Sequence, residues 1–354
     1  MRRRLRGLLG LAMGALVLAA CTDNLPQSSF NSAGDVAQQQ KDLLIPIIVI
    51  ATVIFVLVEG ALVWLLYKYR HREGSEPIQV HGNSKLEIAW TIAPALILAI
   101  ITVPTVSMIY SLAKAPAGKS MTVYAVGHQW WWEFDYPDLN ITTANELYIP
   151  ADTQVYVKLC AAGNTNSGTP VGAPCTVPAP AVGEAVVHSF WVPRLAGKQD
   201  VVPGRTNTMT IEANEPGVYP GQCAEFCGLS HAFMRFKVIA QTPTDFQAWV
   251  TNQQAEAPTP VAGSAADSGL QVFNTAGCVG CHTIGGVSEG VGGTNLTHFG
   301  TRDCFAGCML DVTEENLSKW LHDPASVKPG SFMPNLNLTD DQVASLVAYL
   351  ESLK

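Results

Sequence analysis

The 354-residue sequence predicts a multi-domain chain: a two-helix transmembrane hairpin, an all-β barrel and a small all-α domain. Apolar residues make up 48% of the chain and charged residues only 14%, which is typical of a protein partly embedded in lipid. Two long apolar runs are followed by short runs rich in Val, Thr, Tyr and Trp, and then by helical patterns. The nine cysteines fall into spaced groups that are typical of cofactor sites and disulfides.

Residues 1–20 have the features of a bacterial lipoprotein signal peptide. A basic start precedes an apolar stretch, and Leu18-Ala-Ala-Cys21 resembles a lipobox. We therefore expect cleavage before Cys21 and attachment of lipid to its sulfur. The alternative is an ordinary signal peptide with a chance cysteine after small residues.

The hairpin is predicted over residues 43–112. Its apolar runs, 43–67 and 88–110, each exceed the length needed to cross about 30 Å of hydrocarbon. The short connection between them is basic, with Lys68, Arg70, Arg72 and Lys85. By the positive-inside rule this connection faces the cytoplasm, so both termini lie on the outer face of a bacterial plasma membrane.

The β barrel is predicted over residues 118–245. Its strands are predicted at residues 121–126, 154–159, 186–192, 207–213 and 233–240. Residues 252–267 lack apolar periodicity and are predicted to be a linker with a root-mean-square span of about 22 Å. The all-α domain, 268–354, has predicted helices at 314–322 and 340–353, the second capped by Thr339.

The net charge of −8, without a long basic run, excludes nucleic acid as a partner. An acidic soluble portion suits a cationic protein partner, although a merely solvated surface is the commoner explanation of such a charge balance.

One segment, Gly221-Gln-Cys-Ala-Glu-Phe-Cys-Gly-Leu-Ser-His-Ala-Phe-Met234, concentrates soft metal ligands. Its candidate ligands, together with one residue on an earlier predicted strand, are Cys223, Cys227, His231, Met234 and His188. Thiolate, imidazole and thioether together favour copper. A zinc site would leave the methionine without a role, and a mononuclear blue-copper site needs only one cysteine. Two thiolates can instead bridge two copper ions.

This segment resembles the CuA motif of subunit II of heme-copper cytochrome c oxidases, a cupredoxin-like barrel on a two-helix hairpin. The resemblance extends to Glu87-Ile-Ala-Trp-Thr-Ile-Ala-Pro94, Gly127-His-Gln-Trp-Trp-Trp-Glu-Phe134, His188-Ser-Phe-Trp-Val-Pro193 and Pro203-Gly-Arg205. It implies a binuclear copper centre whose ligands are His188, Cys223, Cys227, His231, Met234 and the backbone carbonyl of Glu225. The Glu225 side chain is implied to support magnesium at the contact with subunit I. An insertion between Cys160 and Cys175 departs from the family pattern but includes no ligand.

The resemblance also implies two further roles. Trp130 would be the surface residue at which electrons arrive from cytochrome c, although strand tryptophans are more often core or rim residues. Glu87 would open a proton path into subunit I, although a charge there can also simply anchor the helix at the interface. Glu59, inside the first apolar run, is the rival candidate for the proton role.

Cys278-Val-Gly-Cys281-His282 is the pattern of covalent c-type heme attachment. A redox dithiol or half a zinc site are alternatives that do not need the adjacent histidine. The last domain resembles class I cytochromes c, with a loop at Asn295-Leu-Thr-His-Phe-Gly300 and a sixth iron ligand at Met333-Pro334. Met309 is the competing ligand, and His298 and His322 are interpreted as ordinary surface or loop residues.

Four cysteines remain, and Cys160 with Cys175 and Cys304 with Cys308 are natural disulfide candidates, although the sequence permits three pairings.

A CuA barrel and a cytochrome c on one chain resemble subunit II of the cytochrome-c-fused (caa-type) oxidases. The resemblance implies that an external donor, such as a cytochrome c or another redox protein, reduces heme c. Heme c reduces CuA, and CuA reduces subunit I, where oxygen becomes water with proton pumping. Subunit I, subunit III and membrane lipid are the implied partners, and the linker would let the cytochrome dock near Trp130 and swing away. The alternative is a membrane-anchored copper and heme electron carrier outside any oxidase. Quinol-oxidase subunits, which lack the copper ligands, and soluble nitrous oxide reductase fit less well.

Overall fold

The computed structural model describes residues 25–70, 82–118, 120–162 and 185–354. Several predicted features therefore lie outside the described residues: the signal peptide with Cys21, Arg72 in the connection, and Cys175. The described chain forms two compact units, of which residues 38–114 are one and the remaining described residues the other.

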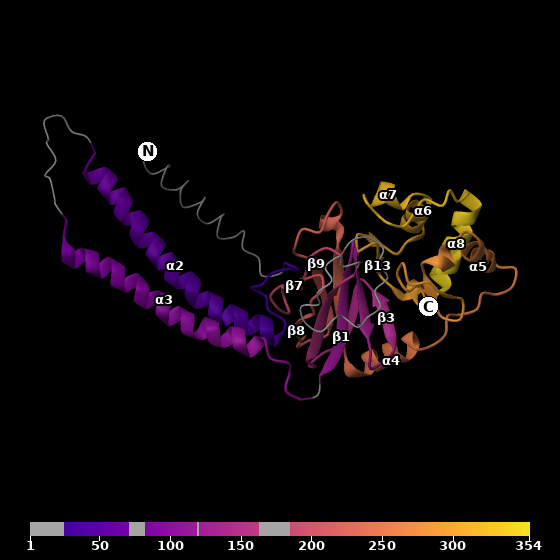
Figure 1. Ribbon diagram of the computed structural model, residues 1–354, viewed down its shortest axis with the longest axis horizontal. Helices are drawn as coiled ribbons and strands as arrows, with labels where there is room; N and C mark the ends of the chain where they lie inside the picture. The colour runs from indigo at the N-terminus through magenta and orange to yellow at the C-terminus, as the bar shows by residue number, and fades with distance from the viewer. Residues whose placement is uncertain (1–24, 71–81, 119, 163–184) are drawn as a thin grey trace, which may run out of the picture. The chain divides into compact units, whose positions relative to one another are not determined.

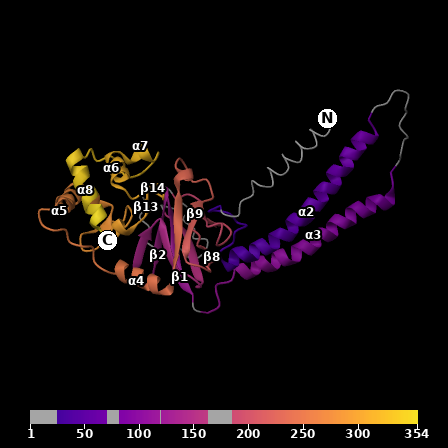
Figure 2. The ribbon, with the colours of Figure 1, turned by 180° about the vertical axis from the view of Figure 1, so that it is seen from behind.

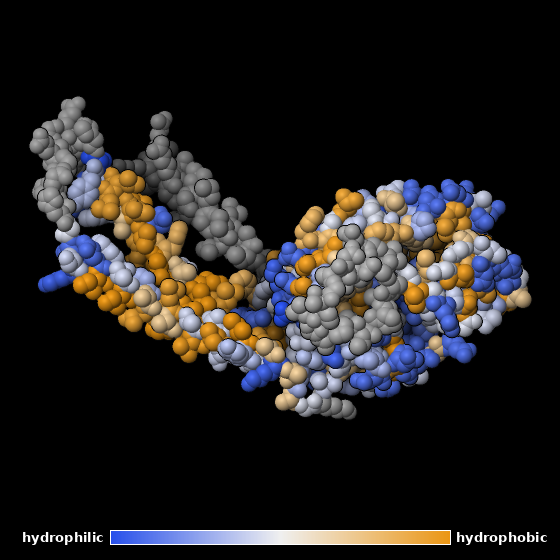
Figure 3. Space-filling model, viewed as in Figure 1, coloured by the Kyte–Doolittle hydropathy of each residue, from blue (hydrophilic) through white to orange (hydrophobic). Residues whose placement is uncertain are grey.

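The first unit is a helical hairpin. Helices α2 (Asp35–Lys68) and α3 (Ser84–Leu112) lie side by side in both ribbon views (Figures 1 and 2). Both are long and apolar enough to cross a membrane, and neither has its most apolar window buried within the chain. Their apolar surface is exposed (Figure 3), so it needs lipid or partner helices to cover it. The two predicted membrane helices are thus confirmed, with interior prolines at Pro46, Pro94 and Pro104.

The β domain, residues 121–241, packs two five-stranded sheets face to face. The first sheet has the order β3 (Ile141–Ala144), β2 (Trp131–Tyr136), β1 (Met121–His128), β5 (Val155–Ala161) and β8 (Asn207–Ile211). The second has the order β4 (Glu146–Pro150), β10 (Arg235–Gln241), β9 (Gly217–Cys223), β6 (His188–Trp191) and β7 (Gln199–Val201). A fully buried aromatic cluster of Trp132, Phe134, Phe190 and Phe236 fills the space between the sheets.

All five predicted strands occur, at β1, β5, β6, β8 and β10. The sequence patterns missed five others. Strand β9 contains Gly217, Pro220 and Gly221, residues that normally argue against a strand, yet it pairs along its length with β10. Strand β2 begins at the second of three consecutive tryptophans, where a period of two is hard to see although burial alternates along it.

Helix α4 (Pro243–Gln253) follows the last strand and packs Trp249 on Tyr148, with ring centroids 4.6 Å apart. Helix α5 (Ala265–Thr275) begins inside the segment predicted as linker. The extended connection is therefore shorter than predicted, since helix α4 enters its start and helix α5 its end. The reason is local: Thr242 and Ser264 each cap a helix by accepting a backbone N–H at the third helical residue.

The C-terminal domain, residues 265–354, packs α5 against α8 (Asp340–Ser352), with α6 (Glu314–His322) and α7 (Pro324–Val327) beside them. The predicted helix at α6 is confirmed. So is α8, where Thr339 and Gln342 form a capping box. Two short hairpins, β11 (Thr283–Ile284) with β12 (Ser288–Glu289) and β13 (Cys304–Phe305) with β14 (Leu310–Asp311), add to the predicted all-α fold.

Candidate functional site

The predicted copper ligands converge at one end of the β domain. Strand β6 supplies His188, β9 ends at Cys223, and the loop between β9 and β10 carries the others. Antiparallel pairing places Phe190 opposite Cys223, and the Cys223 N–H donates to the Met234 carbonyl at 2.9 Å. The two ends of the loop are thereby fixed beside His188.

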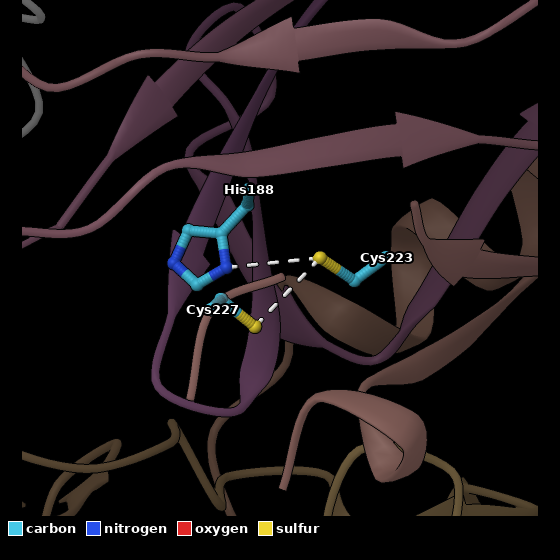
Figure 4. Close-up of side chains that lie close together, drawn as sticks. All are labelled: His188, Cys223 and Cys227. Carbon is cyan, nitrogen blue, oxygen red and sulfur yellow. Dashed lines mark hydrogen bonds between the residues drawn. The ribbon is translucent and has the colours of Figure 1, made fainter. Parts of the chain in front are cut away.

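The donor atoms lie within a few ångströms of one another. Figure 4 shows His188, Cys223 and Cys227 pointing toward a common centre, with their ligand atoms all within 4.8 Å. The distance from Cys223 Sγ is 3.9 Å both to His188 Nδ1 and to Cys227 Sγ. Cys227 Sγ lies 3.5 Å from His231 Nδ1 and 3.8 Å from Met234 Sδ. The sixth donor, the Glu225 carbonyl oxygen, is 3.2 Å from Cys223 Sγ.

Burial and electrostatics at this cluster favour a bound soft cation. His188 and Met234 are fully buried and both cysteines are nearly so. The pKa of the Cys223 thiol is lowered, chiefly by a hydrogen bond from Cys227 to its sulfur. Two sulfurs with one imidazole on each side form a donor set that fits two bridged copper ions and uses the methionine as well.

The tryptophan predicted to receive electrons contacts this cluster. Trp130 Nε1 donates to the Cys227 carbonyl at 2.9 Å, and Gln129 Nε2 donates to the same oxygen at 2.8 Å. Trp130 is not a surface residue, because only 5% of it is exposed. The sequence motif includes Gln129, but nothing in it shows that its side chain holds the ligand loop.

The predicted heme residues line one cavity in the C-terminal domain. Cys278, Cys281, His282 and Met333 all border it, whereas Met309 does not. Its other walls are mainly apolar, including Phe273, Phe299, Leu317, Leu346 and Leu350. Residues 128–131 and Asn145 of the β domain close one side. An apolar cavity with two thiols and an imidazole fits a covalently attached heme.

Hydrogen bonds orient the two candidate iron ligands. His282 Nδ1 donates to the Thr294 carbonyl at 2.8 Å, which leaves Nε2 as the free acceptor. Burial lowers the pKa of His282, so its ring is held neutral, as an iron ligand must be. Trp320 Nε1 donates to Met333 Sδ at 3.1 Å. That hydrogen bond fixes the thioether on the cavity wall.

The structure also places the remaining cysteines and histidines about which the sequence makes a prediction. Cys304 and Cys308 form a disulfide, as one proposed pairing required, and Cys160 is also disulfide-bonded. His298 was predicted to be a surface or loop residue, and it lies in a turn but not at the surface. It is 4% exposed, because its Nε2 donates to the Ala255 carbonyl at 3.1 Å beneath the connecting segment. His322 is exposed and lies 3.4 Å from Asp340.

The fold and donor sets define a class: a membrane-anchored electron-transfer protein with a binuclear soft-metal site and a c-type heme site.

Three known protein families match segments of this chain. They are Cytochrome C oxidase subunit II, transmembrane domain, over residues 25–108; Cytochrome C oxidase subunit II, periplasmic domain, over residues 121–241; and Cytochrome c over residues 266–354.

The chain is 38% identical to cytochrome c oxidase subunit 2 of Alkalihalophilus pseudofirmus, over 98% of this chain and 96% of that one. It is 36% identical to the same subunit of Bacillus sp. (strain PS3), over 99% and 97% of the two chains. The periplasmic domain of subunit II of the Bradyrhizobium japonicum cytochrome oxidase is 25% identical. It covers 40% of this chain and 97% of its own length, with a TM-score of 0.32.

The chain therefore belongs to the cytochrome c oxidase subunit II family, in its cytochrome-c-fused, caa-type form. It is a membrane-anchored subunit of an oxidoreductase complex and associates with other oxidase subunits. Its domains imply binuclear copper CuA and heme c.

Proposed function

We propose that this chain accepts electrons at heme c and passes them through the copper centre to subunit I, where oxygen is reduced to water with proton pumping. The observation that supports this most strongly is the convergence of two thiols, two imidazoles, a thioether and a carbonyl at one end of the β domain. When bound, the copper pair and the heme each supply a reversible one-electron couple.

The copper ligands in this proposal are His188, Cys223, Cys227, His231, Met234 and the backbone carbonyl of Glu225. The buried sulfurs of Cys223 and Cys227 would hold the copper ions in a site shielded from water, and His188 and His231 would each supply an imidazole ligand. Gln129 and Trp130 steady the loop by donating to the Cys227 carbonyl. Trp130 thus lies one hydrogen bond from a copper ligand, which suits the role of final electron relay.

The heme ligands in this proposal are His282 and Met333, with covalent attachment through Cys278 and Cys281. The absence of Met309 from the cavity wall supports Met333 as the sixth ligand. Trp320 withdraws electron density from the thioether sulfur by donating to it. A histidine and methionine pair raises the heme potential into the range of a donor to copper.

Several finer assignments belong to this proposal. The Glu225 side chain is exposed and free to support magnesium at the subunit I contact. Cys21 carries lipid, and both redox domains lie on the outer face of a bacterial plasma membrane. Subunit III is a further partner, and a cytochrome c or similar redox protein is the external donor. Glu87 collects protons at the cytoplasmic end of α3.

A membrane-anchored carrier outside any oxidase fits less well. A carrier needs a single anchor, whereas both helices of this hairpin expose apolar surface along their length. Two such helices are better explained by packing against other subunits.

Electron paramagnetic resonance tests the copper assignment. Cys227→Ser should abolish the mixed-valence binuclear signal, because one remaining thiolate cannot bridge two ions. Glu225→Ala is the matched control on the same loop, and it should retain the signal because only the backbone carbonyl of Glu225 is a ligand. A Cys227→Ser protein with two coppers and the parent spectrum would refute the assignment.

A further inference from the structure

A buried lysine of the C-terminal domain reaches into the β domain. Lys328 follows helix α7 and is 3% exposed. Its Nζ donates to three carbonyls: Trp130 at 2.5 Å, Phe233 at 3.2 Å and Ala306 at 2.7 Å. Two of these acceptors belong to the β domain: Phe233 lies within the copper-ligand loop, and Trp130 donates a hydrogen bond to that loop at the Cys227 carbonyl. All three protons of an ammonium group are thereby used.

Burying this charge is costly, and no carboxylate forms an ion pair with it within the described ranges. The three carbonyls compensate only while both domains hold their present positions. If the domains separated, two acceptors would lose their partner and the ammonium would return to water. The contact therefore belongs to a docked state, and it favours one orientation of the two domains.

The same docked face covers Trp130. The Phe332 ring stacks on the Trp130 ring, with centroids 6.1 Å apart and planes 8° apart. Gly330, whose φ is +82°, allows this approach, because a Cβ there would lie 2.6 Å from the Trp130 ring. Trp130 is therefore shielded by the C-terminal domain of its own chain.

Further hydrogen bonds, besides those of Lys328, join the β domain to the C-terminal domain. Each joins a group of the β domain to the backbone of the C-terminal domain, and such bonds tolerate little rotation. They are Arg235 N to Gly307 O at 2.9 Å, Ser230 Oγ to Pro329 O at 2.6 Å, and the N–H groups of Asp303 and Cys304 to Glu146 Oε1 at 2.8 and 3.0 Å.

We propose that Lys328 is a positioning residue that locks the cytochrome domain onto the Trp130 face of the β domain, so that heme and copper exchange electrons in one fixed geometry. An external protein donor then delivers electrons to the heme and does not dock on Trp130. This differs from the sequence-based expectation of a cytochrome that swings on its linker. The proposal rests on the proposed function for the direction of electron flow, but its test does not.

The test asks whether the cytochrome domain stays bound once its covalent link is cut. A specific protease site is inserted after Ala262, in the exposed connection between α4 and α5, and heme c retained by washed membranes is measured. We expect the cut parent domain to stay bound even in about 0.5 M salt. Among the described residues, the only ion pair that crosses the contact joins Lys237 to Asp303, and it is weak because the Asp303 carboxylate is 67% exposed. Lys328→Met should raise the dissociation constant of the cut domain at least about tenfold.

Lys319→Met is the matched control, because Lys319 is 61% exposed and pairs only with Glu315 of its own helix. It should retain the domain like the parent. Covalent heme content and the copper resonance signal verify that each variant is folded and contains both cofactors. The absence of these signals from the parent protein would count against the proposed function and not against the role of Lys328. Should Lys328→Met fail to accumulate, Gly330→Val removes no charge but obstructs Trp130 and should also release the domain.

Release of the cut parent domain by washing would overturn the proposal. The proposal would also be overturned if the cut Lys328→Met protein retained its cytochrome domain as well as the parent does. If Lys328→Met cannot be obtained, the same result with Gly330→Val would overturn it.

Discussion

The pKa of a side chain in this protein depends on its burial as well as on its residue type. His298 illustrates this, because its sequence context resembles a surface loop although its ring is enclosed beneath the connecting segment. Burial lowers the pKa of His298 from its usual value of 6.5, and the nearby Arg302 guanidinium lowers it further, while the Ala255 carbonyl opposes both. The folded state therefore binds this proton more weakly than the unfolded state does.

This difference predicts a pH dependence of stability. Above about pH 6.5, His298 should not reduce the free energy of unfolding of the C-terminal domain. As pH falls from there through the lowered pKa of the folded state, that free energy should decrease, because the unfolded state binds the proton more tightly. His298→Gln should flatten that decrease in urea titrations of the full chain followed by heme absorbance. The exposed His322→Gln is the control and should keep the parent slope. An equal slope in His298→Gln would show that another group is responsible.

At the level of elements, helix α3 shows how one residue can have a local and a functional role together. Asn83 caps the helix by accepting the N–H groups of Lys85 and Leu86 at 3.1 and 3.3 Å. Glu87 lies in the first turn, where a carboxylate is favoured by the helix dipole. Local stabilisation alone would explain its presence, so its proposed proton role needs a kinetic test.

Glu87→Ala should slow steady-state oxygen reduction while heme c and the copper centre remain fully reducible. The reason is that proton uptake and electron arrival are proposed on opposite sides of the membrane. Glu87→Gln separates the two roles, since it removes the ionisable group with little change in shape. Glu59→Ala, in the interior of α2, is the comparison. If Glu59→Ala is slow and Glu87→Ala turns over like the parent, the two assignments should be exchanged.

At the scale of the whole molecule, topology follows from the hairpin. A basic connection between two spans predicts that both redox domains are outside the cell. A membrane-impermeant labelling reagent on intact cells should modify the exposed Lys319 but not Lys68. Permeabilised cells are the control, in which Lys68 becomes reactive. Labelling of Lys68 alone in intact cells would reverse the orientation and remove the oxidising surroundings expected for the disulfides.

The sequence by itself determined the order of the three parts, both membrane helices, helices α6 and α8, and the grouping of the copper and heme residues. These features are local: apolar length, helical period, capping and motif spacing are all properties of short segments. The ligand loop from Cys223 to Met234 is one such segment, so its chemistry could be predicted before its geometry.

Only the tertiary structure decided the features that depend on contacts between distant segments. Strand β9 forms despite its Gly and Pro residues because β10 and β6 pair with it. Trp130 is buried because Phe332 and Gly330 cover it from far along the chain. Lys328 resembles any solvated lysine in sequence, and only folding brings three carbonyls to its ammonium group. The physical reason is that burial and hydrogen-bond partnership are set by the surroundings of a side chain, which no local pattern encodes.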